Sequence, residues 1–291
     1  MQYSREPDYL TTLADGTVKQ LNPFTGTEVW TVPGRGNRPL GLGGVNAKPL
    51  DPDKHGAYCS FCEKRYEETP PEKSRVVHRG NTTWETHYRT PAEEMYNTVA
   101  DFRRVPNLFE ILSYEYWNLN YGYTLPTHIA GRREAYLASP AGRAHVLSVV
   151  DMKLKASRQS AAKVAAKGED ERIAAATGFF RGGHDLIIAR RHFTDGATDD
   201  AQLAGAGTLT PDEHAQFITY TIESVKGLYD LNRYARYVTV FQNWLKPAGA
   251  SFDHLHKQLV AIDERGYQNE VELARVRDNP NFYNEAAVNF A

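Results

Sequence analysis

The stretch from residue 237 to residue 262 constrains the fold of this chain most. Tyr237 to Phe241 is a run of β-branched and aromatic residues, which favours a strand. The tetrapeptide Lys-Pro-Ala-Gly at 246–249 is typical of a turn. A second strand is therefore expected from about Ser251.

Three polar side chains of this second strand, His254, His256 and Gln258, are spaced two residues apart. Side chains at that spacing share one face of a strand, so we expect all three to project into one pocket, whereas a helix would splay them. An imidazole can ligate a metal, or it can attack an electrophile through its neutral nitrogen. A solvated strand face would also explain an isolated His-x-His.

The only two cysteines, Cys59 and Cys62, form a Cys-x-x-Cys motif after a loop rich in glycine, proline and aspartate. This spacing is compatible with a disulfide or redox pair. It is equally typical of half of a tetrahedral zinc site in an intracellular protein. The other half of such a site would be nitrogen ligands.

Length and charge narrow the class of protein. A chain of 291 residues can form one large domain or two small ones. The formal net charge of -2 offers no basic patch for nucleic acid or an anionic membrane. No apolar run approaches the ~20 residues that span a bilayer, and Met1 to Glu6 lacks a signal-peptide core. We therefore expect a cytoplasmic protein that binds neither nucleic acid nor membrane.

Other segments have recognisable local patterns. Residues 8–32 predict a β-meander with Asp-Gly and Thr-Gly turns, and His184 to Ala189 predicts a short strand. Ser139-Pro140 is a good helix start, and Tyr267 to Arg277 predicts a polar helix. Thr210 begins a capping box, and the helix after it is expected to bury a stripe formed by Ile218, Ile222, Val225 and Tyr229.

The motifs Phe241-Gln242-Asn243, Gly249-x-Ser251 and His254-x-His256-x-Gln258 together resemble the active-site block of the galactose-1-phosphate uridylyltransferase branch of the histidine-triad superfamily. The resemblance implies that His256 is the nucleophile and that His254 is a zinc ligand behind it. Lys257 departs from the usual pattern of the family, and a lysine beside the nucleophile would alter substrate choice.

The same resemblance extends to other parts of the chain. His192, at the end of a strand, falls where the family places a third zinc ligand, so the implied zinc ligands are Cys59, Cys62, His192 and His254. Gln258 and Ser251 would assist His256 by donating hydrogen bonds to phosphate oxygens. The implied substrate-binding residues are Arg35 and Arg38 for phosphates, Asn107 and Phe109 for the nucleoside, and Asn243 and Gly249. Leu108 replaces an acidic residue that would contact the ribose.

These observations predict an α+β fold, namely a histidine-triad-like antiparallel sheet with packed helices and a helical insertion at about 113–182. An exposed insertion without a catalytic role is favoured over a lid. We expect a single domain over 1–291, a homodimer, and transfer of UMP between a nucleotide sugar and a sugar 1-phosphate through a nucleotidyl-histidine. The alternatives are a nucleotide-sugar or dinucleotide phosphorylase or hydrolase, and a non-catalytic nucleotide-binding protein stabilised by zinc.

Overall fold

The computed structural model describes residues 9–34, 47–80, 83–157 and 166–290. The chain divides into two compact units, of which one combines Met1–Asn46 with Glu264–Ala291 and the other is Ala47–Asp263. Each unit is described by itself, and the single domain expected over residues 1–291 stays a prediction.

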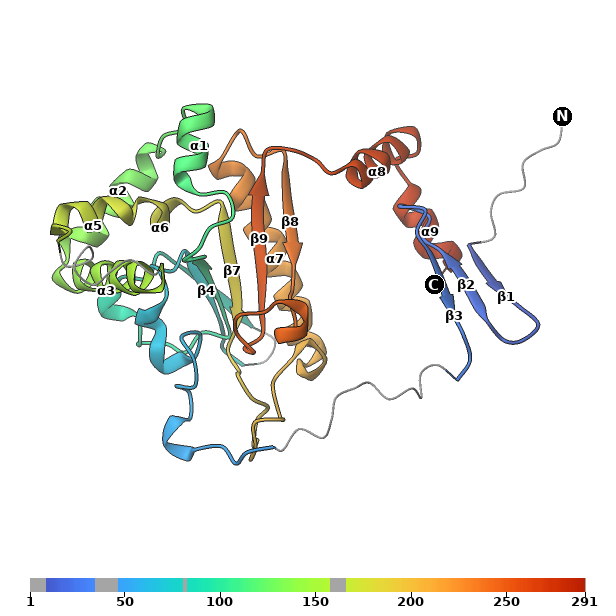
Figure 1. Ribbon diagram of the computed structural model, residues 1–291, viewed down its shortest axis with the longest axis horizontal. Helices are drawn as coiled ribbons and strands as arrows, with labels where there is room; N and C mark the ends of the chain where they lie inside the picture. Colours follow the sequence, from blue (N-terminus) through green and yellow to red (C-terminus); the bar gives the residue numbers. More distant parts are fainter. Residues whose placement is uncertain (1–8, 35–46, 81–82, 158–165, 291) are drawn as a thin grey trace. The chain divides into compact units, whose positions relative to one another are not determined.

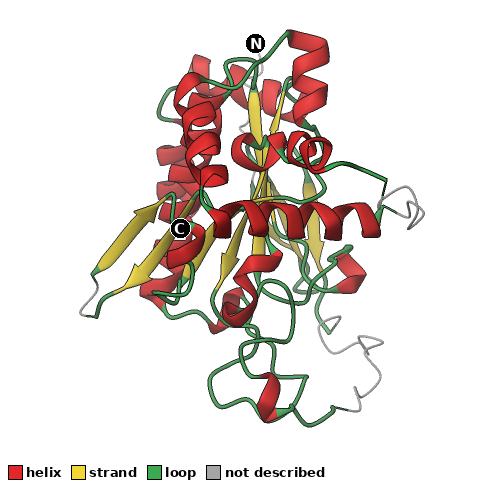
Figure 2. Ribbon diagram, turned by 90° about the vertical axis from the view of Figure 1, so that its left-hand side faces the viewer, coloured by secondary structure: helices red, strands yellow, loops and turns green. Residues whose placement is uncertain are grey.

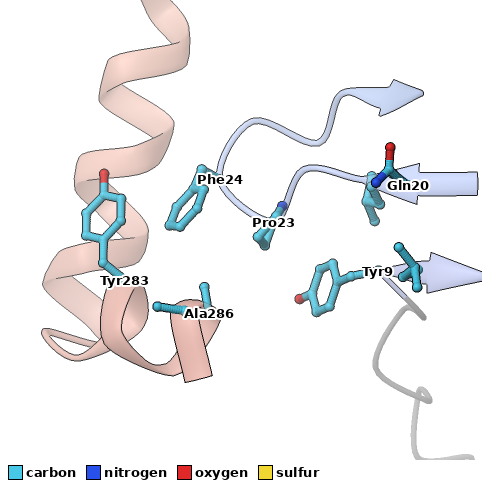
Figure 3. A pocket seen from close by; sticks show the side chains of 9 residues that line it. Tyr9, Gln20, Pro23, Phe24, Tyr283 and Ala286 are labelled. Carbon is cyan, nitrogen blue, oxygen red and sulfur yellow. The ribbon is translucent and has the colours of Figure 1, made fainter. Parts of the chain in front are cut away.

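The smaller unit contains an antiparallel meander and two helices. Strands β1 (Leu10–Thr12), β2 (Val18–Leu21) and β3 (Glu28–Thr31) pair in that order, and α8 (Tyr267–Asp278) and α9 (Phe282–Phe290) come from the other end of the chain. The expected meander and polar helix are thus confirmed. Phe24 stacks on Tyr283 of α9 with ring centroids 4.6 Å apart, beside a hollow of about 400 Å³ (Figure 3).

The larger unit is built on a six-stranded sheet in the order β5-β4-β6-β7-β9-β8, in which every neighbouring pair is antiparallel (Figure 1). Because all of these strand pairs are antiparallel and helices accompany the sheet (Figure 2), the α+β class with antiparallel sheets is confirmed. The six strands are β4 (Ser74–His78), β5 (Trp84–Tyr88), β6 (Phe102–Pro106), β7 (His184–Ala189), β8 (Tyr237–Phe241) and β9 (His256–Ile262).

One face of this sheet is covered by α7 (Pro211–Leu231), which starts at the expected capping box of Thr210 and Glu213. Phe217 of this helix stacks on Phe102 of β6 with ring centroids 5.0 Å apart. The predicted buried stripe was wrong, because the helix is rotated about its axis and buries polar and aromatic side chains instead. The buried residues are Phe217, Tyr220, Thr221, Ser224 and Leu228. Of the predicted stripe, Val225 is half-buried against the core, whereas Ile218, Ile222 and Tyr229 are exposed.

The other face of the sheet is reached by alternate residues of its central strands. Leu186 and Ile188 of β7 belong to an apolar cluster on this face, whereas Ile187 packs with the core beneath α7. In β9, Gln258 lies opposite Leu186 and His256 lies opposite Ile188 in the register, so both side chains share the Leu186 face. The face of β9 that bears His256 is therefore the face away from α7.

The segment 113–182 contributes a group of helices beside the sheet (Figure 1). Its helices pack around their own apolar cluster, which includes Val146, Val149 and Phe180. Ser139 caps α3 as expected, since its hydroxyl accepts a hydrogen bond from the Gly142 amide. The described helices are α1 (Tyr114–Tyr121), α2 (Thr127–Ala138), α3 (Pro140–Ala156), α5 (Glu169–Ala175) and α6 (Thr177–Arg181). None of the helices in the described residues is both long and apolar enough to cross a membrane.

Candidate metal cluster and catalytic pocket

The two cysteines lie on a tight turn immediately before the short helix η3 (Glu63–Glu68). The Cys62 amide donates to the Cys59 carbonyl at 3.0 Å, and the Cys59 amide donates to the Cys62 sulfur at 3.4 Å. This turn brings the two sulfur atoms to 3.8 Å from each other, with both thiols free. A Cys-x-x-Cys motif closed in this way presents two sulfurs to one point.

Two histidines from distant parts of the chain complete the cluster. His192 follows β7, and its Nδ1 lies 3.4 Å from the Cys62 sulfur. His254 precedes β9, and its Nδ1 lies 3.5 Å from the Cys59 sulfur and 3.8 Å from that of Cys62. Its Nε2 donates to the Ala189 carbonyl at 2.6 Å, which leaves the lone pair on Nδ1 to face the sulfurs.

The four donor atoms of Cys59, Cys62, His192 and His254 all lie within 4.8 Å of one another, so the cluster could bind a metal ion. The hydrogen bond from the Cys59 thiol lowers the pKa of the Cys62 thiol. The same hydrogen bond between the two cysteines, together with burial, raises the pKa of the Cys59 thiol. One thiolate is thus favoured in the cluster even without a metal, and thiolate is the form that binds metal.

A cavity of about 630 Å³ lies against the Leu186 face of the sheet and is lined by Ser251, His256 and Gln258. The expected substrate-binding residues Asn107, Phe109 and Gly249 also line it. The Phe61 ring, next to the cysteine turn, packs edge-on against the His256 ring with centroids 5.2 Å apart. The metal cluster and the cavity are therefore neighbours joined through residues 59–62 and 254–256.

His256 is 5% exposed, and its two ring nitrogens have different roles. Its Nδ1 lies 2.7 Å from the His254 carbonyl, to which it donates, so the lone pair of the neutral ring is on Nε2. Burial lowers the pKa of His256, which favours that neutral ring. The cavity thus contains a histidine whose second nitrogen is available to a ligand.

Gln258 is oriented by a buried histidine that sequence reasoning missed. His184 Nδ1 accepts a hydrogen bond from the Ile111 amide at 3.2 Å, so its Nε2 is the donor. Gln258 Oε1 lies 3.0 Å from His184 Nε2 and accepts a hydrogen bond from it. The amide nitrogen of Asn107 also lies 3.0 Å from His184 Nε2, but it is itself a donor and cannot accept this hydrogen bond. Because its oxygen is engaged, the Gln258 amide group is left as a hydrogen-bond donor. The period of two along His184, Leu186 and Ile188 was the sequence pattern that could have placed His184 on this face.

Several expected positions differ from those in the structure, and two expected residues lie outside the described part of the chain. The second strand begins at His256, not at Ser251, so His254 lies in the preceding loop and points to the cysteines rather than into the cavity. Lys257 alternates to the other face of β9, where its Nζ lies 3.9 Å from the Phe217 ring, so it does not stand beside His256. Asn243 is not among the cavity-lining residues. Arg35 and Arg38 lie outside the described residues.

The fold and the site define an α+β protein with a Cys₂His₂ cluster next to a histidine-lined cavity. A model of the family described as a domain of unknown function (DUF4921) matches residues 13–291, so the chain belongs to that family. No curated protein matches the chain.

Two solved structures from Arabidopsis thaliana are similar to the chain. A GalT-like protein has 17% identity and a TM-score of 0.40, over 80% of this chain and 48% of that one. An ADP-glucose phosphorylase with bound ADP-glucose has 15% identity and a TM-score of 0.41, over 92% of this chain and 55% of that one. The chain thus spans about half the length of each structure.

Proposed function

We propose that the chain is a histidine-triad-like nucleotidyltransferase that moves UMP between a nucleotide sugar and a sugar 1-phosphate. The observation that supports this most is the environment of His256. Its Nδ1 is held by the His254 carbonyl at 2.7 Å, and the ring lies in a cavity whose other polar side chains include Gln258 and Ser251. A neutral imidazole fixed in this tautomer is a nucleophile, and amide and hydroxyl donors suit phosphate oxygens.

We further propose that the metal is zinc, held by Cys59, Cys62, His192 and His254. Tetrahedral zinc with bonds of about 2.3 Å to sulfur and about 2.0 Å to nitrogen separates two sulfurs by about 3.8 Å and a sulfur from a nitrogen by about 3.5 Å. The cluster has a sulfur separation of 3.8 Å and sulfur to nitrogen separations of 3.4, 3.5 and 3.8 Å. Zinc with four protein ligands would have a structural role, which is to fix His254 and hence the carbonyl that orients His256.

The reaction would proceed in two displacements at one phosphorus. His256 Nε2 attacks the α-phosphorus of the nucleotide sugar, the bond from that phosphorus to the bridging oxygen breaks, and the sugar 1-phosphate leaves with the electron pair. An oxygen of the second sugar 1-phosphate then attacks, and the phosphorus to nitrogen bond breaks to restore the imidazole. In the intermediate, the proton on Nδ1 stays hydrogen-bonded to the His254 carbonyl. Gln258 and Ser251 would stabilise the negative charge that grows on the phosphate oxygens.

The test is to mix the protein with nucleotide sugars in the absence of an acceptor and to measure the mass of the intact chain. We expect an increment of one nucleoside monophosphate in the wild type and none in His256→Asn. Adding sugar 1-phosphate, inorganic phosphate or buffer alone to the labelled protein then distinguishes a transferase from a phosphorylase or a hydrolase. Absence of both increment and turnover with every nucleotide sugar tried would overturn the proposal in favour of a non-catalytic nucleotide-binding protein.

A further inference from the structure

Two groups among the residues that line the cavity differ chemically, and further polar side chains, among them Glu68, Thr69 and Asn107, line it as well. Ser251, His256 and Gln258 come from β9 and the loop before it and supply hydrogen-bonding groups. The second set is apolar and comes from the loop after β6 and from the last turns of α3, namely Leu108, Phe109, Ile111, Met152 and Ala156. Phosphate requires donors, whereas the flat faces of a nucleobase pack on apolar and aromatic side chains. The second set suits the base.

The helical segment 113–182 forms part of this cavity rather than standing apart from it. Met152 of α3 lines the cavity, and Met152 and Leu108 both pack against the apolar cluster of that segment. Leu108 therefore joins the loop after β6 to the helices. The segment that was expected as an exposed insertion without a catalytic role thus contributes apolar side chains to the cavity wall.

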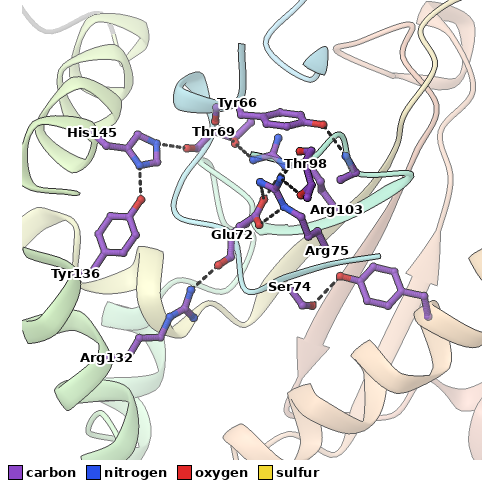
Figure 4. A network of polar contacts seen from close by, with 12 residues as sticks. Tyr66, Thr69, Glu72, Ser74, Arg75, Thr98, Arg103, Arg132, Tyr136 and His145 are labelled. Carbon is purple, nitrogen blue, oxygen red and sulfur yellow. Dashed lines mark hydrogen bonds and ion pairs between the residues drawn. The ribbon is translucent and has the colours of Figure 1, made fainter. Parts of the chain in front are cut away.

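The same helices hold a third wall of the cavity in place. Thr69, which lines the cavity, has its carbonyl oxygen 2.9 Å from His145 Nε2, and the Tyr136 hydroxyl lies 2.7 Å from the Nδ1 of the same ring (Figure 4). Arg132 of α2 donates to the Glu72 carbonyl in the same loop. His145 and Arg132 thus tie residues 69–72 to α3 and α2, so one rigid group of helices sets the position of the cavity wall.

We propose that Met152 is a substrate-binding residue, whose side chain covers the nucleobase of the donor nucleotide together with Phe109. This inference rests on the proposed function, because it takes the ligand to be a nucleotide with its phosphate at His256. The apolar set contains no carboxylate, amide or hydroxyl side chain. Met152 would add an apolar contact to the face of the base, beside polar side chains such as Asn107 and Glu68 that also line the cavity.

The experiment measures the affinity of the full chain by calorimetry for UMP and AMP, and for ribose 5-phosphate as a probe without a base. Met152→Ala is expected to weaken UMP and AMP binding about five- to tenfold, because a half-buried apolar contact is lost, and to leave ribose 5-phosphate binding within about twofold. Met152→Leu, which preserves most of the apolar volume, should bind all three ligands within about twofold of the wild type. Lys155→Ala, at an exposed position of the same helix that does not line the cavity, is the matched control and should change nothing.

Two results would overturn this inference without affecting the proposed function. Unchanged affinity of Met152→Ala for both nucleotides would remove Met152 from the base site. An equal loss for ribose 5-phosphate would show that the residue only maintains the cavity. Failure of the proposed function has a different outcome. The folded wild type would then bind neither UMP nor AMP, and its melting temperature would not change when either nucleotide is added. The inference about Met152 would be overturned together with the proposed function.

Discussion

Glu72 is the only carboxylate among the residues labelled in the polar network of Figure 4, where it pairs with two buried arginines. Its Oε1 lies 2.6 Å from Arg75 Nε, and its Oε2 lies 2.9 Å from Arg103 Nε. The side chains of Arg75 and Arg103 are 0% and 3% exposed, so neither guanidinium has water as an alternative partner. Although burial opposes ionisation, Arg103 and Arg75 lower the pKa of Glu72, which is therefore charged at neutral pH.

Glu72→Gln keeps the size of the side chain and removes its charge. It would leave two buried guanidinium groups without a counter-ion, and breaking a buried ion pair in this way costs about 3–5 kcal/mol. In a unit of this size, that loss corresponds to a fall of roughly 10 °C in melting temperature. The assay is urea unfolding followed by circular dichroism, supported by thermal melting.

The matched control for this prediction is Glu85→Gln. Glu85 pairs with Arg79 on the surface, where the two side chains are 50% and 46% exposed, so its loss should cost far less stability than the loss of the Glu72 charge. The reasoning would be refuted if Glu72→Gln unfolded within about 1 kcal/mol of the wild type, or if the two variants lost the same stability.

Two further predictions concern the metal and the pH dependence of folding. Freshly purified protein should contain one zinc per chain. Cys59→Ser should lose both the metal and stability, whereas the control Ser60→Ala should keep the metal. Elemental analysis that finds no zinc, together with a melting temperature that chelators do not change, would contradict this prediction. Burial raises the pKa of Glu110 from 4.5 to about 6. Between these two pH values the folded chain therefore retains a proton that the unfolded chain has released. Stability should therefore fall by about 2 kcal/mol, relative to Glu110→Gln, as pH rises from 4.5 through 6. A stability difference between the two proteins that is constant across this window would exclude Glu110 as the cause.

Elements with strong local patterns could be predicted from the sequence. The strand Tyr237–Phe241 is a β-branched and aromatic run, and its bounds agree with the prediction. The Ser139 cap of α3, the capping box of α7 and the proline that follows each cap fix the starts of these helices locally, and the sequence shows these residues directly. The metal cluster could be proposed because the family resemblance placed His192 and His254 with the Cys-x-x-Cys motif, and these four residues do lie together.

Features decided by tertiary packing could not be predicted in the same way. The α7 helix turns Phe217 rather than Ile218 toward the sheet, because the aromatic ring stacks on Phe102 and Tyr220 reaches the Ser74 hydroxyl at 2.7 Å. A count of apolar residues at helical spacing does not distinguish these two faces. Likewise, Met152 lines the cavity because of how α3 packs against the loop after β6, and no local sequence pattern encodes that packing.

The site of attachment of the nucleotide tests the central claim most directly. The protein is mixed with a nucleotide sugar without acceptor and quenched in alkali, where phosphohistidine survives, and the labelled peptide is mapped by mass spectrometry. We expect the nucleotide on His256, because the Nε2 of His254 donates to the Ala189 carbonyl and its Nδ1 faces the cysteines. A label on any other residue, or release of sugar 1-phosphate at full rate without a label on any histidine, would contradict the two-step mechanism.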